Sequence, residues 1–154
     1  MQDTLAKFAP VAAVVHMASV GMSGGAMVEY ETFKVCIQCN KGSYYTFSND
    51  SLFSKYMLQT NVHGTQNVVN ACIKAEVKAL LYISTYNVVF GGRAINGGDE
   101  SAKAFPADEH TDKYSQSKAV SEHIILAANG RSMRTCALRP AAIYGEVSCQ
   151  LGAF

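Results

Sequence analysis

The sequence predicts an α/β protein built on a doubly wound parallel sheet. Apolar runs with the length of buried strands occupy residues 11–18, 79–85 and 135–138. Patterns of helical period occupy residues 58–75 and 114–129 between them, so the order is strand, helix, strand, helix, strand. Strands that alternate with helices in this way pair in parallel through right-handed crossovers. The five elements make up half of such a sheet.

Composition indicates one globular domain. The chain has 154 residues, of which 49% are hydrophobic and 16% charged, with a formal net charge of +1. Charges of both signs are scattered along the chain, so the sequence shows no basic cluster that would bind nucleic acid or an anionic membrane surface. No apolar run has the length of a membrane span, and the opening residues are not those of a signal peptide. Five cysteines without framework spacing indicate reduced thiols in an intracellular protein.

The first strand follows Pro10 and runs from Val11 to Ala18 as a segment suited to burial on both faces. It enters a glycine-rich turn at residues 21–25, which lacks the G-x-G-x-x-G spacing of a dinucleotide-binding loop and is interpreted as a turn. His16 near the strand end could be catalytic or a ligand, but a histidine in an apolar run is more often a satisfied core or rim residue.

Residues 29–56 have no steady period and are interpreted as loop and short helix. Cys36 and Cys39 have the spacing of half a zinc site, but no second pair of ligands follows, so free thiols are favoured and no metal site is expected. The helix over residues 58–75 carries apolar residues at helical spacing and leads into the strand that ends at Ser84 and Thr85. Ligands collect at the carboxyl ends of parallel strands; the two hydroxyls could reach one or could cap the next turn.

A polar loop framed by the glycine pairs 91–92 and 97–98 follows and suits the rim of a site. It leads to a helix that begins near Tyr114 and runs to about Asn129. Tyr114 and Lys118 are four residues apart, so they lie on one helix face. A positive charge within ~4–6 Å lowers the pKa of a phenol from its usual value near ~10. Tyr114 would be the acid/base and Lys118 its tuner; the alternative is a plain surface pair.

Several motifs together resemble the extended short-chain dehydrogenases/reductases, and in detail the 42E-like subgroup of the 3β-hydroxysteroid dehydrogenase/isomerase family. The motifs occur in the family's order and spacing: His16-Met-Ala-Ser19, Asn61-Val-His-Gly64-Thr65, Tyr82-Ile-Ser84-Thr85, Tyr114-x-x-x-Lys118 and Leu138-Arg-Pro140-Ala-Ala-Ile-Tyr-Gly145. The resemblance implies the C-terminal half of a Rossmann-like dinucleotide-binding domain.

The resemblance also implies roles for the catalytic residues. Tyr114 would exchange a proton with the substrate oxygen, while Lys118 holds the nicotinamide ribose and depresses the tyrosine pKa. Thr85 matches the hydroxyl that bonds the reacting oxygen, with Ser84 as the alternative. Asn61 would support the site from the neighbouring helix.

By the same resemblance, Ala18 and Ser19 run beside the cofactor, and Pro140 to Ile143 border the nicotinamide carboxamide. The cofactor implied is NAD, with NADP left open. The substrate implied is a steroid-like alcohol or ketone. The full-length family suggests a homodimer and a cytoplasmic or endoplasmic reticulum membrane-associated location.

The sequence departs from the family in three places. The glycine-rich βαβ unit, the acidic ribose-reading residue and the substrate-covering region are not found, and residues 26–57 form a divergent insertion. We therefore expect a partial domain over residues 1–154. Two alternatives follow: an inactive fragment that acts as an interaction module through an exposed sheet edge, or an epimerase or reductase that acts on a sugar or another small alcohol.

Overall fold

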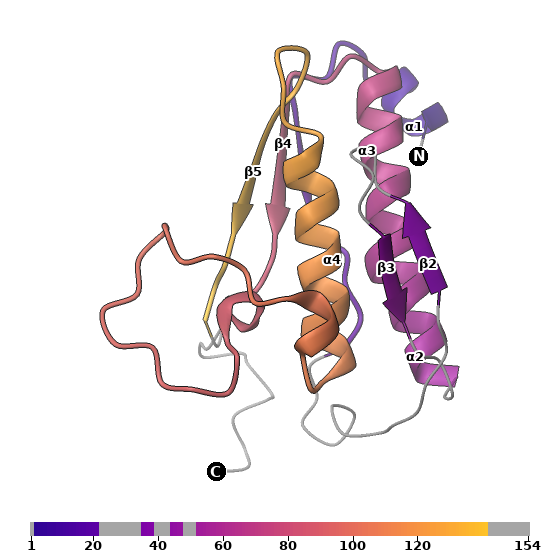
Figure 1. Ribbon diagram of the computed structural model, residues 1–154. Coiled ribbons are helices and arrows are strands. Elements are labelled where there is room, and N and C mark those ends of the chain that lie inside the picture. Colours follow the sequence, from indigo (N-terminus) through magenta and orange to yellow (C-terminus); the bar gives the residue numbers. More distant parts are fainter. Residues whose placement is uncertain (1, 22–34, 39–43, 48–51, 142–154) are drawn as a thin grey trace, which may run out of the picture.

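A computed structural model describes residues 2–21, 35–38, 44–47 and 52–141 (Figure 1). Its main sheet consists of three strands, β1 (Ala13–His16), β4 (Ala79–Ile83) and β5 (Arg134–Leu138), in the order β1-β4-β5. Both pairings are parallel, with Ala13 opposite Ala79 and Ala79 opposite Arg134. The α/β class and the three predicted strands of this sheet are confirmed.

Two helical segments connect these strands. Between β1 and β4, helix α2 (Leu52–Met57), the π-helical turn η2 (Leu58–His63) and helix α3 (Gly64–Lys74) follow one another without interruption. Between β4 and β5 lies α4 (Lys113–Ala127). The first helical segment begins at Leu52 rather than at the predicted Leu58. The sequence contains no sign of this earlier start, because residues 52–57 mix aromatic and polar types and show no apolar period.

The remaining elements are short. They are α1 (Gln2–Lys7), β2 (Val35–Gln38), β3 (Tyr44–Phe47) and the 3₁₀ turns η3 (Tyr86–Val89) and η4 (Ala107–Glu109). Strands β2 and β3 pair antiparallel, which corrects the interpretation of residues 29–56 as loop and short helix alone. Four-residue strands are too short to show a clear alternation in the sequence. Cys39 lies outside the described residues.

The two faces of the sheet differ in burial. Helices α3 and α4 lie on the same side of it (Figure 1), and there Leu80 and Tyr82 are each 1% exposed. On the opposite face Val15 is 55% and Leu138 49% exposed. The sequence predicts strands buried on both faces, whereas in the described part of the chain one face is covered.

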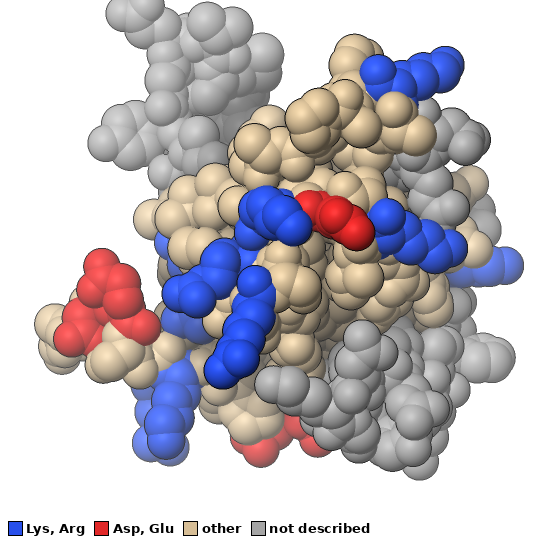
Figure 2. All heavy atoms as spheres, turned by 90° about the horizontal axis from the view of Figure 1, so that it is seen from above, with Lys and Arg blue, Asp and Glu red and all other residues tan. Residues whose placement is uncertain are grey.

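Cations gather at the end of the molecule where the strands begin (Figure 2). The exposed residues that the chain places there follow helix ends or precede strands: Lys7, Lys74, Lys78, Arg131 and Arg134. Positive charge at the carboxyl end of a helix is favourable because of the helix dipole. Lys7 and Lys74, in the last turns of α1 and α3, therefore stabilise these helices. The described helices include none that is long and apolar enough to cross a membrane.

Candidate active site

Tyr114 lies in the first turn of α4, which Asp112 caps by accepting a 2.7 Å hydrogen bond from the Ser115 backbone N–H. Its side chain is 7% exposed and packs on the backbone of Gly21, where an added Cβ would lie 2.7 Å from the Tyr114 ring. Gly21 also has φ +111°, a conformation that favours glycine. A glycine is therefore required at position 21 so that the Tyr114 ring can pack against the segment after β1.

Burial raises the pKa of the Tyr114 hydroxyl above its ordinary value, and hydrogen bonding to the neighbouring Ser19 and Thr85 side chains offsets part of the rise. The prediction from sequence that the Lys118 ammonium lowers the Tyr114 pKa is wrong in its direction. The physical reason is that burial dominates, and the groups that favour the phenolate are Ser19 and Thr85.

Lys118 also reaches the carboxyl end of β4. Its side chain is 2% exposed, its Nζ donates a 2.7 Å hydrogen bond to the Ile83 carbonyl oxygen, and it lies 4.3 Å from the centroid of the Tyr82 ring. Burial lowers the Lys118 pKa to about 8, while the nearby Glu122 carboxylate raises it. An ammonium of this pKa is still mostly charged at pH 7. The fold thus places a buried cation and a buried phenol at one strand end.

Asn61 connects three segments around Tyr114 and Lys118. Its side chain accepts from the Val20 backbone N–H at 2.8 Å and donates to the Val20 carbonyl and to Ser117 Oγ, both at 2.9 Å. Its backbone carbonyl oxygen, in the π-helical turn, accepts from the hydroxyls of Thr65 at 2.5 Å and Ser121 at 2.7 Å. Such turns are often found at functional sites. The predicted supporting residue thus joins the β1 exit to α4.

Thr85 and Ser84 differ in their surroundings. Thr85 Oγ1 accepts from the Asn87 backbone N–H at 3.3 Å, which caps η3, and the Thr85 side chain also lowers the pKa of the nearby Tyr114. Ser84 Oγ is buried and has no partner within the described residues. Of the two alternatives for this strand end, the turn cap is present at Thr85. Contact with a ligand, and with it any role of Thr85 or Ser84 towards a substrate, stays a prediction.

The residues predicted to border a cofactor are placed in part. Ser19 contacts Tyr114, and the exposed Ala18 precedes it. The Pro140 carbonyl oxygen accepts from the Tyr86 N–H at 3.0 Å, so the segment after β5 adjoins the turn that follows Thr85. Ile143 lies outside the described residues.

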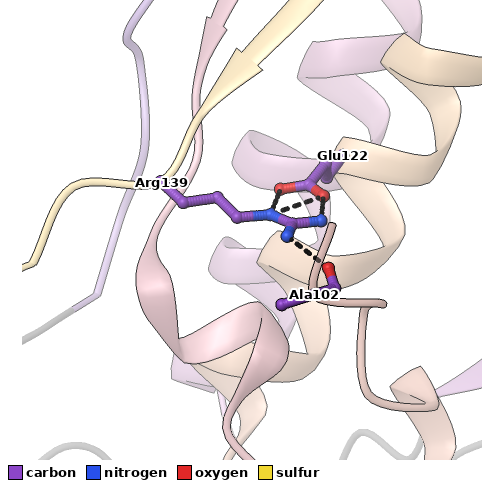
Figure 3. Close-up of polar contacts among 3 residues, drawn as sticks. All are labelled: Ala102, Glu122 and Arg139. Carbon is purple, nitrogen blue, oxygen red and sulfur yellow. Dashed lines mark hydrogen bonds and ion pairs between the residues drawn. The ribbon is translucent and has the colours of Figure 1, made fainter. Parts of the chain in front are cut away.

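Sequence reasoning missed an ion pair beside this site. The buried Glu122 on α4 pairs with Arg139 at the end of β5, with a distance of 2.6 Å between Glu122 Oε1 and Arg139 Nη2 (Figure 3). Arg139 Nη1 also donates to the Ala102 carbonyl oxygen at 2.8 Å. The available signal was an acidic residue four positions after Lys118, on the same helix face. Its partner is distant in sequence.

His16 belongs to the polar layer under the site. Its Nε2 lies 2.8 Å from Thr65 Oγ1, and its ring centroid lies 5.3 Å from that of Tyr82. Because the Thr65 hydroxyl donates to Asn61, His16 Nε2 is the donor in this contact. Burial and the Lys118 charge lower its pKa. Both observations agree with a satisfied core histidine.

A cavity of about 690 Å³ opens between α4, β5 and the loop after η3. It is lined by Tyr86, Glu122 and Arg139 among others, which are neighbours of Thr85 and Lys118. The cavity lies on the β5 side of α4, and its lining does not include Tyr114, Thr85 or Lys118. Among the described residues, no group of three or more His, Cys, Asp or Glu side chains could hold a metal ion.

Comparison with known sequences identifies relatives. A profile of the 3-beta hydroxysteroid dehydrogenase/isomerase family matches residues 43–154. Short-chain dehydrogenase/reductase family 42E member 1 of mouse is 38% identical over 142 residues, which cover 88% of this chain and 30% of the relative. The 3beta-hydroxysteroid-dehydrogenase/decarboxylase isoform 2 of Arabidopsis thaliana is 43% identical over 106 residues, 66% of this chain and 18% of the relative. The chain thus spans at most about a third of the length of these relatives.

Solved structures share the fold. UDP-glucuronic acid 4-epimerase from Bacillus cereus, in complex with NAD, has a TM-score of 0.61 at 17% identity. The match covers 92% of this chain and 36% of the epimerase chain. The Bordetella bronchiseptica enzyme WbmG, in complex with NAD, has a TM-score of 0.60 at 22% identity, and the match covers 90% of this chain and 33% of the WbmG chain. At these identities the likeness concerns the fold, a partial Rossmann-like sheet.

Proposed function

The chain belongs to the 3-beta hydroxysteroid dehydrogenase/isomerase family, and from this premise we propose that its site serves an NAD-dependent oxidoreductase that acts on a CH–OH group. The observation that carries the proposal is the convergence of Tyr114, Thr85 and Lys118 at the carboxyl end of β4. Open parallel sheets bind their ligands at such strand ends.

In this proposal Tyr114 is the acid/base. With its pKa raised by burial, the phenol is protonated at neutral pH and can donate to the oxygen of a bound ketone. The Thr85 hydroxyl, a neighbour of Tyr114, orients the same oxygen. The Ser19 and Thr85 side chains, which favour the phenolate, stabilise the negative charge that Tyr114 develops when the proton leaves. In the direction of alcohol oxidation, Tyr114 takes the proton back.

The residues at this strand end fit the nicotinamide half of NAD. Ser84 Oγ is buried without a partner in the described residues, and Lys118 Nζ has three N–H donors, of which one is donated to Ile83. Lys118, Ser19 and Pro140 would hold the nicotinamide riboside. When bound, NAD supplies the hydride acceptor. No G-x-G-x-x-G loop occurs in the sequence, so no residue is assigned to the diphosphate.

A steroid-like alcohol is the proposed substrate. The support is the family itself and the Arabidopsis relatives, which are named 3beta-hydroxysteroid-dehydrogenase/decarboxylase and are 43% identical. The structural neighbours include UDP-glucuronic acid 4-epimerase from Bacillus cereus, but identities of 16–22% bear on the fold alone. A 3β-hydroxysteroid is therefore the first substrate to assay, with UDP-glucuronic acid as the competing choice.

Replacement of the acid/base tests the proposal. In a protein that carries this site together with a diphosphate-binding loop, Tyr114→Phe should reduce steroid-dependent NADH formation by roughly 10²–10⁴-fold, because general acid/base catalysis contributes that much. The dissociation constant for NADH should stay within about a factor of two of the native value, since the ring remains. Tyr86→Phe, a tyrosine that is 46% exposed, is the matched control. Retention of a tenth of the activity in the Tyr114 variant would reassign the acid/base.

A second candidate function is a binding module without turnover. The exposed apolar face of the sheet, with Val15 and Leu138, favours it because monomeric proteins rarely leave such faces uncovered. The chain lacks the diphosphate loop, so we expect fluorescence titration of the 154-residue chain to show no saturable binding of NADH. A micromolar dissociation constant would instead support a complete cofactor site in this chain.

A further inference from the structure

The Arg139 guanidinium is committed to two acceptors. Its Nη2 donates to Glu122 Oε1 at 2.6 Å, and its Nε lies 3.1 Å from Oε1 and 3.3 Å from Oε2. Its Nη1 donates to the Ala102 carbonyl oxygen in the loop at 2.8 Å (Figure 3). The Glu122 residue is 2% exposed, so this pair lies mostly out of water. Planar, charge-assisted contacts of this kind are stronger and more directional than those of an ammonium.

A second cation is close to the same carboxylate. Lys118 and Glu122 are four residues apart on α4, a spacing at which opposite charges attract each other. Yet the Lys118 ammonium donates to the Ile83 carbonyl oxygen and lies over the Tyr82 ring. Across the described residues, the ion pair of Glu122 is with Arg139 and none joins it to Lys118. The buried Lys118 and the partly exposed Arg139 thus lie near one carboxylate, and the Arg139 guanidinium forms the ion pair with it.

We propose that Arg139 is a positioning residue: by holding the Glu122 carboxylate towards β5 and the loop, it leaves the Lys118 ammonium directed at the carboxyl end of β4. There the ammonium is next to the strand end that carries Thr85, on the helix that carries Tyr114. The functional meaning of this arrangement rests on the proposed function. The arrangement itself does not.

The charged and titratable groups around Lys118 identify Glu122 as its competing partner. They come from its own helix (Tyr114 and Glu122) and from the strands packed against it: Tyr82 on β4, His16 on β1 and, beyond Glu122, Arg139 on the β5 side. Tyr82 and Tyr114 are neutral at pH 7 because burial raises their pKa, and His16 is neutral because its pKa is lowered. Glu122 is the group that raises the Lys118 pKa.

The proposal is tested by measuring the pH titration of the Lys118 side chain in the 154-residue chain. The ¹³Cε resonance of Lys118 is recorded against pH in the native chain, in Arg139→Met and in the double variant Arg139→Met/Glu122→Gln. In Arg139→Met the carboxylate is free to pair with Lys118, so the lysine should bind its proton about tenfold more tightly or more, since an opposite charge in contact shifts a pKa by 1–3. The double variant should return the titration to the native midpoint or below it.

Matched variants separate positioning from folding. Arg134→Met changes an exposed arginine at the other end of β5 and should leave the Lys118 titration unchanged. If Arg139→Met does not fold, Arg139→Lys keeps a cation but loses the planar guanidinium that holds both carboxylate oxygens. It should shift the midpoint of the Lys118 titration in the same direction by less. A Lys118 titration that does not move in the folded Arg139 variant, or that Glu122→Gln fails to reverse, would overturn the proposal. No measurement here involves cofactor or turnover, so failure of the proposed function would leave the result intact.

Discussion

Helices α3 and α4 pack side by side on the same face of the sheet, but different forces position them. The buried residues of α3 are mainly apolar and recur at helical spacing: Val68, Val69, Ala71 and Cys72, with Thr65 as the polar member. Helix α4 is buried nearly all round, and half of its buried residues are polar: Ser115, Gln116, Ser117, Lys118, Ser121 and Glu122. Apolar burial stabilises a helix without fixing its rotation, whereas hydrogen bonds have direction.

This difference explains how the site is oriented. Ser121 Oγ donates to the Asn61 carbonyl oxygen at 2.7 Å, and Asn61 Nδ2 donates to Ser117 Oγ at 2.9 Å. These bonds fix both the rotation and the height of α4 against the η2–α3 segment. Tyr114 and Lys118 are thereby aimed at the end of β4. The helix that carries the chemistry is held by directed bonds, and its neighbour by apolar area.

The largest expected effect comes from removing the centre of these bonds. Asn61→Ala should lower the free energy of unfolding by about 3 kcal/mol, because the Val20 backbone and Ser117 Oγ lose their partners and each unsatisfied buried group costs ~1–3 kcal/mol. Asn70→Ala is the matched control, since that exposed asparagine accepts one exposed hydrogen bond from Gln66. Urea denaturation measures both. Equal effects of the two variants would mean that apolar packing alone positions α4.

The buried charge of α4 should make stability depend on pH. The Lys118 pKa is lowered to about 8 in the folded chain, against an ordinary value of 10.5. Between these values the unfolded chain binds more protons, so the free energy of unfolding rises with pH, by roughly 1–2 kcal/mol from pH 8 to 9.5. The raised pKa values of Tyr82 and Tyr114 act oppositely near pH 10 and above. The raised pKa of the buried Cys72 thiol does so from its ordinary value of 9.0 upward, so it offsets part of this rise.

Urea midpoints at pH 8 and 9.5 measure this rise. Lys118→Met should show it greatly reduced, because no titrating group then remains at that position. A rise of the same size in the variant would assign the effect to another group. Lys74→Met, an exposed lysine at the end of α3, serves as the control.

The smallest effects come from an isosteric pair on α3. Thr65→Val removes a hydroxyl that bonds His16 and Asn61. Val69→Thr places a hydroxyl in the apolar core, where Val69 is buried. Each should cost about 1 kcal/mol, since the first leaves a buried partner unsatisfied and the second buries a new polar group. Thermal unfolding compares them. A stabilising Thr65→Val would show that the polar layer adds specificity without stability.

The predictable parts of the site are local in sequence. Lys118 follows Tyr114 by four residues, so helical geometry places both on one face, and the end of the strand at Thr85 could be predicted from an apolar run and the residues after it. The contacts that sequence reasoning missed join distant residues: Arg139 to Glu122, Asn61 to Ser117, and Lys118 to the Ile83 carbonyl. No periodicity encodes such contacts. The four-residue strands β2 and β3 were missed because they are too short for a pattern.

The sequence alone determined the order of the strands and helices of the main sheet and the spacing of the tyrosine and the lysine, because period and spacing are properties of neighbouring residues. The tertiary structure decided the charge and direction of those side chains. Burial raised the pKa of Tyr114 where the sequence predicted a lowered one, and Arg139 rather than Lys118 took the Glu122 carboxylate. Both outcomes depend on desolvation and on competition between charges that come together only when the chain folds.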